Sequence, residues 1–259
     1  MPTLKAVDAL YRGVTRVNAV AWHLAHCSRT CGRLLAAAIA LCFVGCSDRG
    51  TDSQLERSQH LSMLMDLDHK TAAGELVILG SSTVARWPDS VLPGAVRLGI
   101  PGDTVPGLAA RMSGYRSLAS ARGVVIMIGF NDLKANCNVA AVNFNSLTKS
   151  LPRDVPIAWV GIQGVSPTAR VEMCSGNMSQ LTVDFNLRVE AVCSQIPVCR
   201  YVAHPVPAYV DGPTSRQLQT ADGVHLTNEG YIELGKALIR AGEAFSTDRT
   251  TSTELPNYD

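Results

Sequence analysis

The 259-residue sequence lacks a strong charge of either sign, because 23 lysines and arginines nearly balance 22 aspartates and glutamates and leave a formal net charge of +1. Without a strongly basic surface, the chain has no electrostatic basis for binding nucleic acid, and nothing favours a strongly anionic substrate. No internal repeat is visible. With 46% hydrophobic and 17% charged residues, the chain can bury one substantial core, and we expect one domain.

The sequence also gives no sign of a permanent membrane span at its N-terminus. The apolar run at residues 34–44 is shorter than the roughly 20 residues that a spanning helix needs. Arg29 and Arg33 lie just before it, and Gly45 and Cys46 close it, which is the layout of a signal peptide. Residues 43–46 resemble a lipobox, with Phe43 where leucine is usual. We therefore interpret residues 1–46 as an N-terminal extension and signal peptide.

Export to a bacterial cell envelope follows from this interpretation. The polar stretch from Ser47 onward favours a periplasmic lipoprotein held to the membrane by a lipid on Cys46, and a freely secreted protein is the alternative. We expect residues 47–70 to form a polar tether and a first helix. We expect residues 71–245 to form the folded domain and residues 246–259 to form a disordered polar tail.

No CxxC pair occurs in the domain, and no histidine stands at ligand spacing from its cysteines, so a zinc site is not favoured and we expect neither a metal nor a cofactor. Of eight cysteines, four lie in the domain, an even number that suits disulfides in an exported protein. Cys193 and Cys199 bracket a short loop, so we pair them and leave Cys137 with Cys174. Four cysteines allow three connectivities, and the sequence alone does not decide among them.

Five short apolar runs recur along the domain and are bounded by glycine, proline or charged residues. They lie at residues 76–79, 95–98, 124–128, 157–160 and 201–203. Amphipathic segments at residues 104–118, 181–192 and 227–244 fit helices. Apolar strands separated by helices indicate a parallel sheet covered on both faces. The predicted fold class is an α/β three-layer α/β/α sandwich with a five-stranded, mainly parallel sheet.

Ligand sites in such folds lie at the carboxyl ends of the strands. Gly80, Ser81 and Ser82 follow the first run, at a strand-to-helix turn where unpaired backbone N–H groups could stabilise an oxyanion next to a serine nucleophile. Helix capping is the alternative role of these serines. A glycine-containing loop with Gly102 follows the second run, and Asn131 follows the third. Asn131 could present its side-chain amide toward the same point, or serve as a turn residue.

Asp222 and His225 lie three residues apart just before the last predicted helix. A carboxylate at this spacing can accept a hydrogen bond from the imidazole Nδ1–H and leave Nε2 to accept a proton from a serine. The domain has one other histidine, His204, which lies among prolines. His225 is therefore the preferred base, and a surface histidine without a catalytic role is the alternative.

Taken in order, these segments resemble the SGNH (GDSL-type) serine ester hydrolases over roughly residues 75–240. The resemblance implies a flavodoxin-like sheet, Ser82 as nucleophile and His225 as base oriented by Asp222. It also implies Gly102 as a backbone oxyanion donor and Asn131 as a side-chain oxyanion donor.

Two positions depart from the family pattern. The usual Gly-Asp-Ser is here Gly80, Ser81 and Ser82, which makes Ser81 a rival nucleophile, and we prefer Ser82 because its spacing from Gly80 is the family's. Arg97 stands where the second block commonly has an asparagine, so the support of that loop is open.

The function that the resemblance implies is hydrolysis of acyl esters, short-chain or acetyl, through an acyl-enzyme on Ser82. Expected substrates are small-molecule esters, acylated glycans or lysolipids, and we expect Trp87, Phe130 and the loop at residues 165–178 to line the substrate pocket. Two alternatives stay open. One is acyl transfer to another hydroxyl at the same site, and the other is a catalytically silent, envelope-anchored module that binds carbohydrate or lipid.

Overall fold

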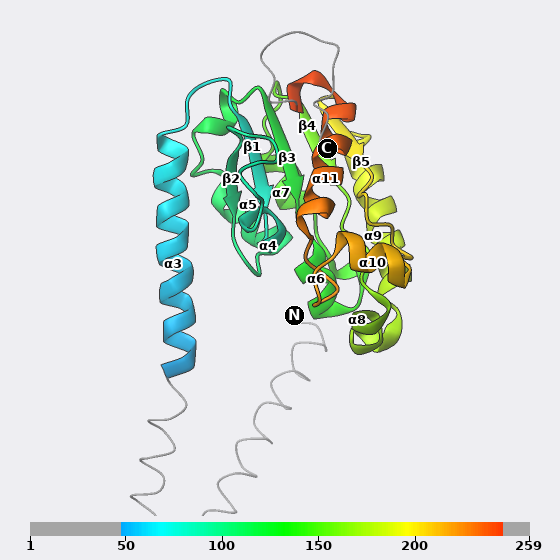
Figure 1. Ribbon diagram of the computed structural model, residues 1–259. Helices are drawn as coiled ribbons and strands as arrows, with labels where there is room; N and C mark the ends of the chain where they lie inside the picture. The colour runs from blue at the N-terminus through cyan, green and yellow to red at the C-terminus, as the bar shows by residue number, and fades with distance from the viewer. Residues whose placement is uncertain (1–47, 246–259) are drawn as a thin grey trace, which may run out of the picture. The chain divides into compact units, whose positions relative to one another are not determined.

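The computed structural model describes residues 48–245, and its compact unit starts at Arg57. In this unit one five-stranded parallel sheet has the order β2-β1-β3-β4-β5 (Figure 1). The strands are β1 (Leu76–Gly80), β2 (Val96–Gly99), β3 (Gly123–Met127), β4 (Ile157–Val160) and β5 (Cys199–Val202). Each predicted strand is confirmed within about two residues, and the order is that of flavodoxin-like sheets. The predicted fold class is therefore confirmed.

Helices connect the strands and cover the sheet. They are α3 (Asp48–His69), α4 (Ser82–Ala85), α5 (Val105–Met112), α6 (Phe130–Asn136), α7 (Asn145–Ser150), α8 (Pro167–Glu172), α9 (Met178–Cys193), α10 (Gly212–Leu218) and α11 (Asn228–Ala241). Short 3₁₀ turns lie at η1 (Ser117–Ala119), η2 (Val139–Ala141), η3 (Cys174–Gly176) and η4 (Glu243–Phe245).

Helix α5 ends earlier than the hydrophobic pattern predicts, which is a correction to the expected range 104–118. The N–H of Gly114 donates to the carbonyl of Arg111 at 3.1 Å, and the N–H of Tyr115 donates to the carbonyl of Met112 at 3.1 Å. These bonds to the third preceding residue close a turn, and glycine is a poor helix former. The apolar residues beyond it, including Leu118, reach the core from the turn instead of from the helix.

Alternate residues of each strand enter two different cores, as the period of a strand requires. Val77 and Leu79 of β1 pack in the core under α5, α7 and α9, whereas Leu76 and Ile78 pack in the core under α4, α10 and α11. All five β1 residues are buried, because both faces of the sheet are covered. Two cores on either side of one sheet make the three layers.

Helix α3 contributes to the compact unit from Arg57 onward. Leu64 is buried in the first core, and the buried Asp68 carboxylate accepts hydrogen bonds from the backbone N–H of Arg116 at 2.7 Å and of Ser117 at 3.2 Å. The segment that we expected to be a tether and a first helix thus supplies side chains to the domain. Within residues 48–245, no helix is both long and apolar enough to cross a membrane.

The expected signal peptide with its lipobox, and the expected tail at residues 246–259, lie outside the described residues.

Both expected disulfides are present. Cys137, at the end of α6, is bonded to Cys174 of η3, and Cys193, at the end of α9, is bonded to Cys199 of β5. The sequence separations are 37 and 6 residues. The Cys137–Cys174 disulfide closes a loop that contains α7, β4 and α8. The Cys193–Cys199 disulfide closes the short turn into the last strand.

We expect the two disulfides to differ in how much they stabilise the fold. Replacing Cys137 and Cys174 together by serine should lower the free energy of unfolding by about 4 kcal/mol, and replacing Cys193 and Cys199 by about 2 kcal/mol, because a longer loop loses more entropy when it is closed. Urea unfolding of both double variants measures the difference. Equal losses, or the larger loss at Cys193 and Cys199, would contradict this ranking.

Candidate active site

Ser82 lies at the start of α4, directly after β1. The N–H of Ser81 extends the sheet by donating to the carbonyl of Met127 at 3.3 Å, and the carbonyl of Ser81 accepts from the N–H of Ala85 at 3.0 Å. A side chain at Gly80 would collide with β3, because its Cβ would lie 2.2 Å from the Met127 oxygen, and a side chain at Gly99 would collide with α4, because its Cβ would lie 2.4 Å from the Ala85 nitrogen. Because these two glycines have no side chain, the turn with Ser82 can pack closely against the neighbouring strands.

His225 reaches Ser82 from the loop before α11. Its Nε2 lies 2.9 Å from Ser82 Oγ, and its Nδ1 lies 2.6 Å from Asp222 Oδ2. An ionised carboxylate can only accept a hydrogen bond, so Nδ1 carries the proton and Nε2 is left to accept from the serine hydroxyl. The three side chains thus form a continuous chain of hydrogen bonds from a hydroxyl to a carboxylate.

Asp222 is held in the ionised form by its hydrogen bonds. Partial burial acts to raise its pKa, but hydrogen bonds from the His225 side chain, from the N–H groups of Val224 and His225 and from the Thr220 hydroxyl outweigh burial, and the pKa of Asp222 lies well below its ordinary value. Its side chain is 47% exposed, and Arg86 Nη1 lies 4.0 Å from Oδ2. This carboxylate can therefore balance a positive charge on His225.

Two buried glutamines support the loop that carries His225, and sequence reasoning missed both. Gln219 donates from Nε2 to the carbonyls of Gly164 at 2.8 Å and Gly223 at 3.1 Å. Gln163 donates to the carbonyl of Val224 at 3.3 Å. Gln163 follows β4 closely, so the strand-end rule that selected the other site residues could have found it. Gln219 gave no comparable signal.

The two expected oxyanion donors follow β2 and β3, the strands on either side of β1: Gly102 lies on the loop after β2, and Asn131 lies in the first turn of α6. Asn131 donates from Nδ2 to the backbone carbonyl of Asp103 at 2.8 Å, and Gly102 precedes Asp103 in a conformation with φ of +75°. The structure thus connects the Asn131 side chain to the Gly102 loop. Both segments leave the sheet at the edge where Ser82 lies, because the strands are parallel.

Ser82 lies on the wall of a pocket with about 320 Å³ of empty space, part of it open to solvent. The pocket is lined by the residues after β1, by the end of β3 with the start of α6, and by the residues after β4: Ser81, Ser82, Thr83, Met127, Ile128, Phe130, Gly161, Ile162 and Gln163. Phe130 lines it as expected, whereas the expected loop at residues 165–178 contributes none of these lining residues. Trp87 does not, because it is buried against Tyr231 with ring centroids 5.4 Å apart and donates from Nε1 to the Val91 carbonyl.

His204, the other histidine of the domain, is buried and has a different environment. Its Nδ1 accepts a hydrogen bond from the N–H of Val206 at 3.0 Å, so Nε2 carries the proton, and this atom is buried without a hydrogen-bond partner among the described residues. Burial lowers the pKa of His204 to about 3. The side chain is therefore neutral at physiological pH.

In the part of the chain that the structure describes, no group of three or more histidine, cysteine, aspartate or glutamate side chains is placed to hold a metal ion.

A serine, a histidine and a carboxylate joined in this order form the kind of site found in serine hydrolases on several folds. Residues 79–231 match the model of the GDSL-like lipase/acylhydrolase family, and the chain belongs to this family of esterase-type enzymes. No curated protein matches the sequence.

Solved structures share the fold. A Streptococcus pneumoniae protein described as a candidate platelet activating factor has a TM-score of 0.63 at 19% identity, over 75% of this chain and 99% of that one. A GDSL-like lipase from Bacteroides thetaiotaomicron has a TM-score of 0.55 at 21% identity, over 70% of this chain and 96% of that one. At these identities the likeness extends to the fold alone.

The buried His204 should make the fold sensitive to acid. Below its ordinary pKa of about 6.5 the unfolded chain binds a proton at this residue, whereas the folded chain does not until about pH 3. The stability that neutral His204 provides is complete above pH 6.5 and should be lost as the pH falls, by about 1.4 kcal/mol per pH unit.

Urea unfolding of wild type and His204→Asn between pH 7 and pH 4 tests this expectation, with the exposed His69→Asn as the matched control. The difference between wild type and His204→Asn should shrink as the pH falls. A difference that is independent of pH would show that His204 does not cause the acid sensitivity.

Proposed function

We propose that the protein hydrolyses short-chain acyl esters through an acyl-enzyme on Ser82. The observation that carries this proposal is the 2.9 Å distance between Ser82 Oγ and His225 Nε2, with His225 Nδ1 fixed by Asp222. Membership of the acylhydrolase family supports the reaction class. The modest pocket beside Ser82 supports a small acyl group.

In the proposed first step, Ser82 Oγ attacks the ester carbonyl carbon while its proton passes to His225 Nε2. The carbonyl oxygen becomes an oxyanion, stabilised by the N–H groups of Ser82 and Gly102 and by the second Nδ2–H of Asn131. The ionised Asp222 stabilises the imidazolium that forms. The C–O bond to the alcohol then breaks, and His225 returns the proton to the leaving alkoxide oxygen.

In the second step, a water molecule attacks the acyl-enzyme. His225 takes a proton from that water, the acyl–Ser82 bond breaks, and His225 returns the proton to Ser82 Oγ, so that a carboxylic acid leaves and the enzyme is restored. The half-exposed Asp222 and the open pocket leave room for water beside the acyl group. Access for water favours hydrolysis over transfer to another hydroxyl, and adding an alcohol acceptor and measuring transester product distinguishes the two.

We also propose that the enzyme acts in the bacterial cell envelope, on acylated glycans or on lipid esters. This part rests on the signal-like run at residues 34–44 and on Cys46. Extraction of the full-length chain with the membrane fraction, lost on Cys46→Ser, would support the lipid anchor. Secretion of the wild-type chain into the medium would contradict it.

Replacing the nucleophile should abolish the reaction. Ser82→Ala should lower kcat for p-nitrophenyl acetate by more than about a thousandfold, because the oxyanion donors without a nucleophile keep only a residual rate. A fluorophosphonate probe should label Ser82 in wild type and give no adduct in Ser82→Ala. Ser81→Ala is the matched control, because it removes the neighbouring hydroxyl, and it should keep both activity and labelling.

Two results would overturn the assignment. An adduct on Ser81 would make that residue the nucleophile, and a wild-type protein without any adduct would support the silent binding module.

The pocket should limit the acyl chain. Among p-nitrophenyl acetate, butyrate and octanoate, kcat/KM should fall by at least about tenfold from the acetate to the octanoate, because a chain that does not fit collides with the pocket wall and displaces the ester carbonyl from Ser82 in the transition state. Phe130→Ala enlarges the pocket and should reduce this ratio. A wild-type preference for the octanoate would contradict a short-chain specificity.

A further inference from the structure

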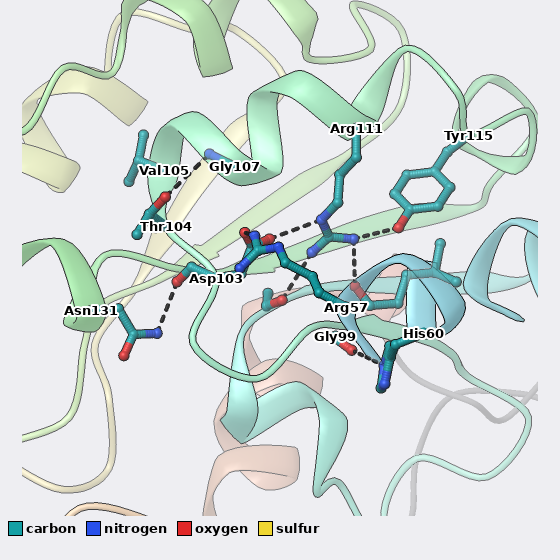
Figure 2. A network of polar contacts seen from close by, with 12 residues as sticks. Arg57, His60, Gly99, Asp103, Thr104, Val105, Gly107, Arg111, Tyr115 and Asn131 are labelled. Carbon is teal, nitrogen blue, oxygen red and sulfur yellow. Dashed lines mark hydrogen bonds and ion pairs between the residues drawn. The ribbon is translucent and has the colours of Figure 1, made fainter. Parts of the chain in front are cut away.

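The carboxylate of Asp103 is the centre of a buried polar cluster beside the proposed oxyanion donors (Figure 2). Its side chain is 0% exposed and forms ion pairs with two arginines, at 2.9 Å from Oδ2 to Arg111 Nε and at 2.7 Å from Oδ1 to Arg57 Nη2. A carboxylate removed from water needs such partners, because its desolvation is costly. Each carboxylate oxygen of Asp103 is thus bonded to an arginine.

Arg111 ties this carboxylate to the sheet. Its guanidinium also donates to the backbone carbonyls of Gly80 and Leu98, each at 2.9 Å, and contacts the Tyr115 hydroxyl. Gly80 is the last residue of β1, two positions before Ser82. Arg111 therefore joins the end of the nucleophile's strand to the loop that carries Gly102.

Arg57 holds the same carboxylate from the other side, from helix α3. One turn later, His60 Nε2 lies 3.0 Å from the carbonyl oxygen of Gly99, the last residue of β2, and must carry the proton because a carbonyl only accepts. Gly107 makes room for the Arg57–Asp103 pair, since a Cβ there would lie 2.2 Å from Asp103 Oδ1 and 3.3 Å from Arg57 Nη2. Helix α3 thus contacts the chain after β2 at two places, at the carbonyl of Gly99 and at the carboxylate of Asp103.

The backbone of Asp103 carries this restraint to both oxyanion donors. Its carbonyl accepts from Asn131 Nδ2, which fixes which end of the amide faces the loop, and the amide nitrogen carries a second N–H that can donate elsewhere. Gly102 is the preceding residue, so its N–H moves with Asp103. A shift of Asp103 therefore displaces both donors together, and a misplaced donor costs catalytic rate.

We propose that Arg57 is a positioning residue of the oxyanion hole, acting through Asp103 on Gly102 and Asn131, with His60 as the second contact from α3. The proposal rests on the function proposed above. Arg57 is half-exposed, and the Asp103 carboxylate keeps its ion pair with Arg111 when Arg57 is removed. The loop with Gly102 then loses one of the two arginines that hold it. The expected defect is partial and confined to the chemical step.

Steady-state kinetics with p-nitrophenyl acetate tests the proposal. Arg57→Ala should lower kcat about three- to tenfold, a fraction of the roughly hundredfold loss expected when a whole donor is removed in Asn131→Ala. KM and the pH profile of kcat/KM should not change, because neither the pocket nor the Asp222–His225 pair is touched. Arg57→Lys keeps the charge and should recover part of kcat. Lys70→Ala removes an exposed cation at the end of α3 and should leave kcat unchanged.

A double-mutant cycle shows whether Arg57 acts through Asn131. The effect of Arg57→Ala should be smaller in the Asn131→Ala background than in wild type, because one of the two displaced donors is already gone. All variants are assayed below their melting temperatures, and Arg57→Gln replaces Arg57→Ala if the latter does not fold.

An Arg57→Ala protein with a lower melting temperature but wild-type kcat would overturn the positioning role, and so would fully additive effects in the cycle. Failure of the proposed function looks different. In that case Ser82→Ala and Asn131→Ala themselves would leave the activity unchanged.

Discussion

The parallel pairing of β2, β1 and β3 is the constraint on which the site depends. Gly80 lies in register with Gly99 on one side and with Met127 on the other, so three chain segments leave the sheet at the same level. Parallel strands need long crossovers, which places the following loops at one edge instead of at alternate ends. The turn with Ser82, the loop with Gly102 and the helix start with Asn131 are neighbours for this reason.

Two carboxylates at this edge of the sheet, Asp222 and Asp103, have opposite surroundings and different partners. Asp222 is half-exposed and ionised by hydrogen bonds, and it orients His225, whose charge changes in the proposed reaction. Asp103 is fully buried between two guanidiniums and serves a loop that has to stay still. Water near Asp222 is compatible with the proposed reaction, because a proton and a water molecule move beside His225 in it. Water near Asp103 would weaken the ion pairs that hold Asn131 through the backbone.

Sequence patterns predicted the strands, the longer connecting helices, the Cys193–Cys199 disulfide and the loop with Asp222 and His225, because each depends on local periodicity or short spacing. They could not predict the contacts of Arg57 or of Gln219. A half-exposed arginine on a helix usually lies in solvent, and a glutamine near a helix end has no preferred partner in sequence. Their partners are 46 and 55 positions away, respectively. Such contacts follow from the fold and not from the pattern.

The two departures from the family pattern are explained by where the loop supports come from. Arg97, in place of the usual asparagine, pairs with Asp89 at the surface and leaves its Nε buried without a partner among the described residues, so it does not hold the second loop. Arg111 and Asp132 hold it instead, since the Asp132 carboxylate accepts from the N–H of Val105 at 3.0 Å. The turn at Ser81 is likewise fixed by backbone hydrogen bonds and by Arg111 on the carbonyl of Gly80. Because the restraints act on main-chain atoms, the missing acidic side chain leaves the position of Ser82 intact.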